Sequence, residues 1–299
     1  MPQTKTKGRL VRTLLIPVGL AVLAVLLLVL TRPLTHLSPT FTPDYPMEDL
    51  TSLLDGHALT QEEYETLFLQ TGLGRAGVDS WMALGEAGVQ AILDTQTAFF
   101  TPPQTACDPL ALTTWEDHHV DSEGNVTYGF PMAPLEEGDV LLSFSTHTLG
   151  WRHGHAGLVV DAADGLTLEA VLIGSDSAVV YARHWASYTT YLHLRLRDLP
   201  DADRAAITQF AWEELDGIPY HLTSGIFSPD KFQDPDSDGL GAQCAYLVWY
   251  ALASAGYDVD SDGGRIVTVG DIAQSPLFEV VQVYGLDPRD YMEQEGGPS

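Results

Sequence analysis

Cys244 is the residue whose type and position point most directly to covalent chemistry. It begins a strongly apolar run, Cys244–Ala255, which is followed by Gly256 and is predicted to form a helix. Unpaired backbone N–H groups and the positive end of the helix dipole stabilise an anion at a helix N-terminus. We therefore expect Cys244 to favour the thiolate, which is the form in which a cysteine acts as a nucleophile.

A cysteine nucleophile needs a nearby base, and His155 is the first candidate. His155 is the first residue of a predicted strand. Its neighbours, Gly154 and Ala156, are small and leave the imidazole accessible. Glu169 lies among apolar residues on the next predicted strand, and a buried carboxylate there needs a partner such as an imidazole N–H. The sequence thus predicts a nucleophile, a base and an orienting acid, with His153 as the alternative base.

The expected strand register separates the histidine from the acid. A two-residue hairpin turn predicted at Asp164–Gly165 would place Glu169 opposite Val160. Glu169 would then be too far along the ladder to contact His155 unless a bulge or strong twist intervened. The alternatives for the third residue are Ser175 and Asp176.

The elements that must position these residues indicate an α+β fold, with an antiparallel β-meander packed on helices. Short apolar runs predict strands over Val140–Ser145, Ala156–Val160, Leu166–Ile173, Ala178–Ala182 and Phe278–Tyr284. Helical spacing predicts helices near Thr60–Gly72, within Val78–Phe100, over Arg204–Asp216 and over Cys244–Ala255. Thr60 and Glu63 form a predicted capping box, and Gly72 is placed to end that helix.

We divide the chain into seven segments on these patterns. In order they are a basic N-terminus (1–12), a transmembrane helix (13–31), a proline-rich spacer (32–48), a helical region (49–100), a loop excursion (101–134), the main α+β domain (135–285) and a flexible tail (286–299).

The transmembrane prediction rests on Leu14–Leu30, a run of 17 residues without a charge. A helix of this run would be about 26 Å long, close to the thickness of a bilayer core. Basic residues precede it, so the positive-inside rule predicts a single-pass cell-membrane protein with an extracellular C-terminal domain. A cleaved signal peptide is the alternative.

Charge limits the possible partners. The chain has 14 Lys and Arg against 41 Asp and Glu, for a formal net charge of −27 among 299 residues. Such a surface repels phosphate backbones, and we expect no nucleic-acid partner.

Two acidic stretches match the start of a calcium-binding loop, but the twelfth positions, Ala245 and Val269, lack the bidentate acid. Solvated turns are the alternative explanation for these weak calcium candidates, which are Asp234, Asp236, Asp238, Asp258, Asp260 and Asp262. His147, His153 and His155 match no standard zinc spacing, so we expect no metal or other cofactor.

Four short stretches together resemble the NlpC-type cysteine peptidases and amidases of bacterial envelopes, in their circularly permuted branch. They are Gly138-Asp139-Val140-Leu141, Gly154-His155-Ala156-Gly157-Leu158-Val159, Leu168-Glu169-Ala170 and Gln243-Cys244-Ala245-Tyr246-Leu247-Val248-Trp249. In unpermuted members the cysteine precedes the histidine, whereas here His155 precedes Cys244, as in the permuted members.

The resemblance implies a permuted papain-like domain over residues 135–285, with Cys244 as nucleophile, His155 as general base and acid, and Glu169 orienting the imidazole. It implies hydrolysis of amide bonds, with cell-wall peptides as the expected substrate. Tyr220 resembles an aromatic residue that family members place near the cysteine, and Gln243 and His153 are further candidates for contacts with substrate.

Two other functions remain open at this point. A lipid acyltransferase or esterase could use the same residues, and a membrane anchor would favour it by proximity. A non-catalytic scaffold or binding module would instead hold Cys107 and Cys244 in a disulfide, as is common outside the cytoplasm.

Overall fold

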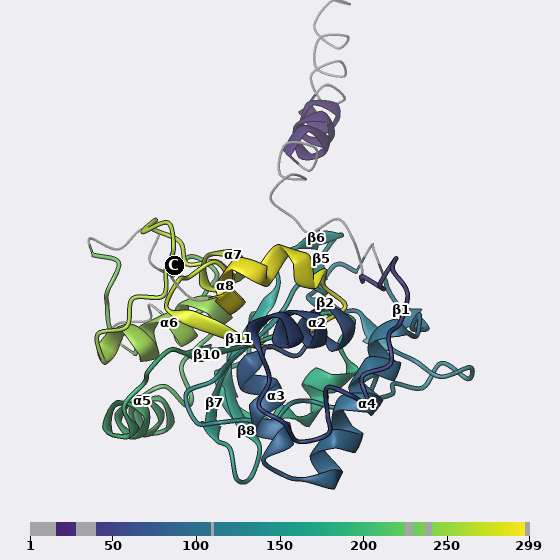
Figure 1. Cartoon of the computed structure of the whole chain (residues 1–299). Coiled ribbons are helices and arrows are strands. Elements are labelled where there is room, and N and C mark those ends of the chain that lie inside the picture. The colour runs from purple at the N-terminus through teal and green to yellow at the C-terminus, as the bar shows by residue number, and fades with distance from the viewer. Residues whose placement is uncertain (1–15, 28–39, 109–110, 225–229, 237–240, 297–299) are drawn as a thin grey trace, which may run out of the picture.

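The chain forms an α+β structure around one large antiparallel sheet (Figure 1). The computed structural model describes residues 16–27, 40–108, 111–224, 230–236 and 241–296. The sheet has six strands in the order β11-β10-β4-β7-β8-β9. Their bounds are β4 Val140–Ser143, β7 His155–Asp161, β8 Leu166–Glu169, β9 Ala178–Tyr181, β10 Tyr191–Leu196 and β11 Phe278–Tyr284.

Five of these strands occupy predicted runs, but β10 is missing from the sequence-based prediction. It lies between β4 and β11 in the sheet. Its alternate side chains include His193 and Arg195, which are both buried and both contact Asp139. A strand that is polar on one face gives a weaker apolar signal than its neighbours, although it is central to the sheet.

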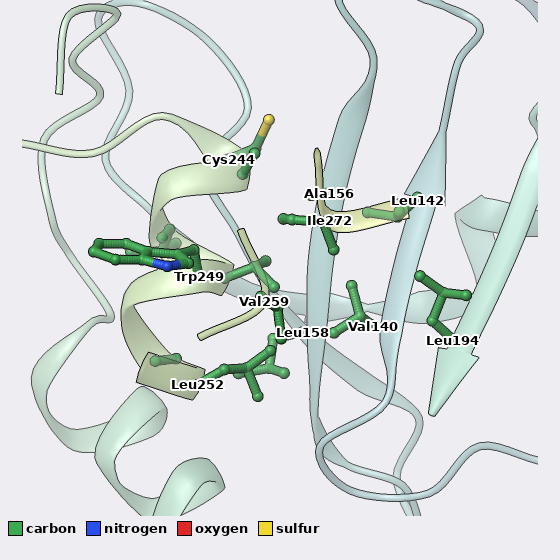
Figure 2. Close-up of a cluster of buried hydrophobic side chains, with 14 of the residues drawn as sticks. Val140, Leu142, Ala156, Leu158, Leu194, Cys244, Trp249, Leu252, Val259 and Ile272 are labelled. Atoms are coloured by element: carbon green, nitrogen blue, oxygen red, sulfur yellow. The ribbon is translucent and has the colours of Figure 1, made fainter. Parts of the chain in front are cut away.

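One face of the sheet packs against helices α5 (Asp201–Glu214), α6 (Cys244–Ser254) and α7 (Val269–Ala273). Because strand side chains alternate, Val140 and Leu142 enter this layer while Leu141 enters the opposite one. Residues 244–252 of α6 are all buried, as expected of a helix that is apolar on every side. Figure 2 shows this layer, with Cys244 at the N-terminal end of α6 and at the edge of the cluster.

The other face is covered by an aromatic cluster and by helices α2 (Gln61–Thr71), α3 (Arg75–Met82) and α4 (Glu86–Phe100). The predicted capping box is confirmed, because Thr60 and Glu63 exchange their hydrogen bonds at the start of α2. Gly72 follows α2 with a positive φ of 71°, as predicted for its end.

The hairpin between β7 and β8 differs from the prediction, and the difference determines the site. The turn spans residues 162–165, so Asp161 pairs with Leu166. A further register shift between Val159 and Asp161 places Glu169 opposite Gly157, not opposite Val160. The predicted two-residue turn was therefore wrong, and the bulge that the acid would need in order to approach the histidine is present.

The described residues of segment 101–134 include the short strands β1 (Thr105–Ala106), β2 (Trp115–Glu116) and β3 (His118–His119). Strand β2 joins β5 (Thr146–Thr148) and β6 (Trp151–Arg152) in a small sheet. Within the segment expected to be a flexible tail, residues 288–296 form the 3₁₀ helix η4 (Pro288–Tyr291) and helix α8 (Met292–Gly296), and α8 contacts β11.

The N-terminal prediction requires a correction. Residues 16–27 are helical, and this described stretch is about 18 Å long at 1.5 Å per residue. No helix in the described part of the chain is both long and apolar enough to cross a membrane. This finding contradicts the transmembrane helix predicted over residues 13–31, of which 13–15 and 28–31 lie outside the described residues together with the basic segment 1–12.

Candidate active site

Cys244 begins helix α6 directly after its N-cap residue, Gln243. The Gln243 side chain accepts a hydrogen bond from the backbone N–H of Ala245 at 2.9 Å, while its amide nitrogen donates to the Val267 carbonyl at 2.7 Å. Both ends of this side chain are therefore engaged in holding the first turn of α6 against the loop before α7. Cys244 is buried, with 6% of the residue exposed, and its thiol donates to Gln243 Oε1 at 3.7 Å.

His155 lies between Cys244 and Glu169. Its Nε2 is 2.7 Å from Glu169 Oε2, and Cys244 lies close enough to influence the pKa of the imidazole. With Nε2 engaged by the carboxylate, Nδ1 is the ring nitrogen left for the thiol. The three predicted catalytic side chains thus form one chain of contacts, in which the acid orients the imidazole and the imidazole faces the sulfur.

The Glu169 carboxylate is fixed by four donors. Trp185 Nε1 and Thr167 Oγ1 donate to Oε1 at 2.8 and 2.6 Å. His155 and His184 approach Oε2 at 2.7 and 3.3 Å. The Trp185 ring also stacks on the His155 imidazole, with ring centroids 5.1 Å apart and an interplanar angle of 9°. The acid and the imidazole are therefore held in one orientation by packing as well as by hydrogen bonds.

Gly157 provides the space for this arrangement. A Cβ atom at this position would lie 2.9 Å from Trp185 Cζ2 and 3.1 Å from Glu169 Cγ. Gly154, directly before His155, has a φ of +78°, and a Cβ there would meet the Ser143 carbonyl oxygen at 2.8 Å. Glycine is required at both positions for spatial reasons, and at Gly154 for its backbone conformation as well.

The charges of the buried pair support each other. Burial alone would lower the pKa of His155, but its hydrogen bonds to Cys244 and Glu169 and the charge of Glu169 raise that pKa well above its usual value. Burial would raise the pKa of Glu169, but the two histidines hold it far below its usual value. This arrangement favours an imidazolium at His155 beside the ionised carboxylate of Glu169.

Tyr220 pairs with Ala242, two residues before Cys244, in an isolated bridge. Burial and the negative charge that Cys244 can carry raise the pKa of Tyr220 well above its usual value. The phenol therefore keeps its proton over the physiological range and can donate a hydrogen bond to a developing oxyanion.

The alternative base and acids are used elsewhere. His153 contacts Thr148 Oγ1 at 3.2 Å and the Gly154 carbonyl at 2.9 Å, and burial lowers its pKa. Ser175 donates to the Leu172 carbonyl within a turn, and Asp176 pairs with Pro219 in an isolated bridge. Of the three candidate acids and hydroxyls, Glu169 is the one that contacts the His155 imidazole.

Sequence reasoning missed three residues of this site: Glu116, His184 and Trp185. The last two lie in the 3₁₀ helix η2 (Ala182–Ser187), a length too short to show an apolar period. Glu116 accepts hydrogen bonds from Ser143 at 2.9 Å, Ser145 at 2.6 Å and Thr146. Burial raises its pKa, against the opposing effect of the nearby His155 charge. A single polar residue such as Glu116, within the segment 101–134, gives no sequence signal that it lies near His155.

Only some of the aspartates that were weak calcium candidates lie close to one another. Asp260 and Asp262 come together with Asp271, while Asp258 accepts a hydrogen bond from Trp249. The Asp260 carboxylate already forms an ion pair with Lys231. In the first stretch Asp234 caps the backbone of Asp236, and Asp238 lies outside the described residues.

The disulfide alternative is contradicted. Both cysteines are free, Cys244 beside His155 and Cys107 beside His147 and Arg152 in the excursion.

No family model matches the chain, and no curated protein matches it. Among solved structures, the metalloprotein yiiX from Escherichia coli O157:H7 is similar at 16% sequence identity and a TM-score of 0.37, over 50% of this chain and 97% of that one. A similarity this weak decides neither the fold nor the function of this chain.

Proposed function

We propose that this protein is a cysteine hydrolase that cleaves amide bonds through an acyl-enzyme. The observation that carries the proposal is the position of His155, between the Cys244 side chain at the start of α6 and the buried carboxylate of Glu169. Nucleophile, base and orienting acid in that order are the requirements for covalent acyl transfer.

The proposed reaction begins when the Cys244 thiolate attacks the substrate carbonyl carbon and forms a carbon–sulfur bond. The oxyanion accepts hydrogen bonds from the Cys244 backbone N–H and from the Tyr220 hydroxyl. The His155 imidazolium gives its proton to the leaving amine as the carbon–nitrogen bond breaks. Water then attacks the thioester, His155 takes its proton, and the carboxylic acid leaves with the thiolate restored.

The sequence resemblance supports cell-wall peptides as the first substrate class to test. The lipid acyltransferase or esterase alternative uses the same residues, and a turnover assay with ester substrates would distinguish it. The scaffold alternative required a disulfide between Cys107 and Cys244, which are both free.

The test is alkylation of the full chain with iodoacetamide without reductant, over about pH 5 to 9, on either side of the ordinary thiol pKa of about 8.5. Mass spectrometry would assign each modified cysteine. In the chain treated with a chelator, Cys107 is an internal control, because partial burial and the Asp117 carboxylate raise its pKa to about 11. We expect Cys244 to react at acidic pH and Cys107 to react slowly throughout.

Two variants complete the experiment. His155→Ala should abolish the acidic-pH labelling of Cys244, and Cys244→Ser should abolish release of amines from cell-wall peptides while the protein stays folded. Labelling of Cys244 that is no faster than that of Cys107, or that is independent of His155, would refute the hydrolase proposal.

A further inference from the structure

A second cluster of chemically capable side chains lies in the excursion, outside the proposed catalytic residues. Cys107 directly follows β1, Asp117 lies between β2 and β3, and His147 lies on β5. One donor atom from each of the three lies within 4.8 Å of the other two. Asp117 and His147 are fully buried, while Cys107 is exposed to solvent.

The contacts converge on one nitrogen. His147 Nε2 is 3.0 Å from Asp117 Oδ1 and 3.9 Å from Cys107 Sγ. His147 Nδ1 is buried and has no hydrogen-bond partner among the described residues. A catalytic relay would use the two ring nitrogens for different partners, as at His155. Three ligand atoms that lie within 4.8 Å of one another instead suit a single cation.

The donor set selects the cation. Thiolate, imidazole and carboxylate are the ligands that Zn²⁺ takes in proteins, at about 2.3 Å for sulfur and about 2.0 Å for nitrogen or oxygen. Tetrahedral geometry at these lengths separates neighbouring ligand atoms by roughly 3.3 to 3.6 Å. The observed N···O separation of 3.0 Å is shorter and the observed N···S separation of 3.9 Å longer than these values. Each differs by a few tenths of an ångström, which side-chain rotation on binding can supply. We propose that Cys107, Asp117 and His147 bind a zinc ion, with water at the fourth position on the exposed side.

Arg152 fits as an outer partner of this site. Its guanidinium donates to Asp117 Oδ2 at 2.5 Å, to the Ser145 carbonyl at 3.1 Å and to Cys107 Sγ at 4.0 Å, while Asp117 Oδ1 faces His147 Nε2. Outer partners of this kind orient a carboxylate ligand. The positive charge of Arg152 repels a zinc ion at this cluster. The negative charge of a Cys107 thiolate is therefore needed for tight binding of zinc.

The ion would connect the excursion to the sheet that carries the proposed catalytic residues. Asp117 directly follows Glu116, whose carboxylate accepts hydrogen bonds from Ser143 and Ser145. Ser143 pairs with His155 across β4 and β7. A zinc ion on Asp117 and His147 would therefore fix strand β2, and with it Glu116, beside His155. Zinc binding at this cluster is independent of the hydrolase chemistry, because it uses neither Cys244 nor His155.

The experiment uses the full chain after treatment with a chelator. Calorimetric titration with Zn²⁺ gives the affinity and stoichiometry, and substitution with Co²⁺ gives the near-ultraviolet charge-transfer absorption that a thiolate ligand produces. We expect one equivalent of zinc, a cobalt–thiolate band, and a melting temperature that rises with added Zn²⁺. Cys107→Ser is the main variant, since an exposed residue can be changed without loss of folding, and Cys244→Ser is the matched control.

Cys107→Ser should lower the zinc affinity more than tenfold, remove the cobalt–thiolate band and remove the rise in melting temperature. Cys244→Ser should leave all three unchanged. Absence of binding in the wild type, persistence of the band in Cys107→Ser, or its loss in Cys244→Ser would each overturn the proposed site.

Discussion

Glu169 reaches His155 diagonally across the β7–β8 hairpin. Its cross-strand partner is Gly157, two residues beyond His155 on the same face of the sheet. A diagonal neighbour in an antiparallel ladder lies within reach of a long side chain, and the carboxylate comes to 2.7 Å from the imidazole. The missing side chain at Gly157 leaves the space through which Glu169 makes this contact.

Gly157→Ala should therefore crowd the side chains that hold the His155 imidazole. The added methyl group would press on Trp185 and on the Glu169 side chain, and overpacking of this kind costs about 1 to 3 kcal/mol. We expect this loss in urea unfolding, together with slower alkylation of Cys244. The control is Gly270→Ala, where the new Cβ would meet Thr268 Oγ1 at an ordinary 3.5 Å. Equal stability of the two variants would contradict the crowding at Gly157.

The ion pair of His155 and Glu169 should make stability depend on pH in a defined window. The raised pKa of His155 contributes stability in full below about pH 6.5, and this is lost as the pH rises through the folded value. The lowered pKa of Glu169 contributes in full above about pH 4.5, and this is lost as the pH falls through the folded value. The pair therefore stabilises the fold most between these two pH values.

Glu169→Gln removes the carboxylate charge while keeping the side-chain shape. It should lower the free energy of unfolding by roughly 3 to 5 kcal/mol, as for the loss of one partner of a buried pair, and the difference from wild type should be largest between about pH 4.5 and 6.5. Chemical unfolding at several pH values measures it. Glu62→Gln, at an exposed position of α2, is the control and should show no such maximum. A difference that is constant from pH 4 to 9 would argue against the ionised pair.

The candidate residues could be found from sequence because each one stands at a recognisable place in a local pattern. Cys244 begins an apolar run that ends at a glycine, and Glu169 is an acid within an apolar strand. Their contacts could not be predicted, because the register depends on a four-residue turn and a bulge where Asp164–Gly165 suggested a tighter turn. One residue of register changes which side chains meet across a hairpin.

Polar residues of the core were also hidden from sequence patterns. His193 and Arg195 on β10 contact Asp139 at 2.7 and 2.8 Å across the sheet, and burial of this group weakens the apolar period of the strand. Although burial opposes it, the charge of His193 and the bonds from Arg195 hold the pKa of Asp139 below its usual value. Such pairing depends on residues more than 50 positions apart, which a local window cannot associate.

Gln243 was expected to contact substrate; in the structure its Oε1 accepts from the Ala245 N–H and from the Cys244 thiol, and its amide nitrogen donates to the Val267 carbonyl. Gln243→Ala should cost about 0.5 to 2 kcal/mol, the range for loss of an N-cap side chain. The substitution should change kcat by a larger factor than KM, because it disturbs the first turn of α6, which carries Cys244. Unfolding and steady-state kinetics measure the two effects. A large rise in KM at unchanged stability would instead return Gln243 to a substrate-binding role.

Tyr220→Phe tests the second oxyanion donor. The phenol keeps its proton because burial and the charge of Cys244 raise its pKa, so it can donate a hydrogen bond as negative charge develops on the substrate oxygen. Loss of one such donor costs about 100-fold or more in kcat, and KM should change little because the bond strengthens only in the transition state. Alkylation of Cys244 by iodoacetamide forms no oxyanion and should keep its wild-type rate in this variant. A parallel fall in alkylation and turnover would mean that Tyr220 acts on the thiolate, and unchanged turnover would remove it from the oxyanion site.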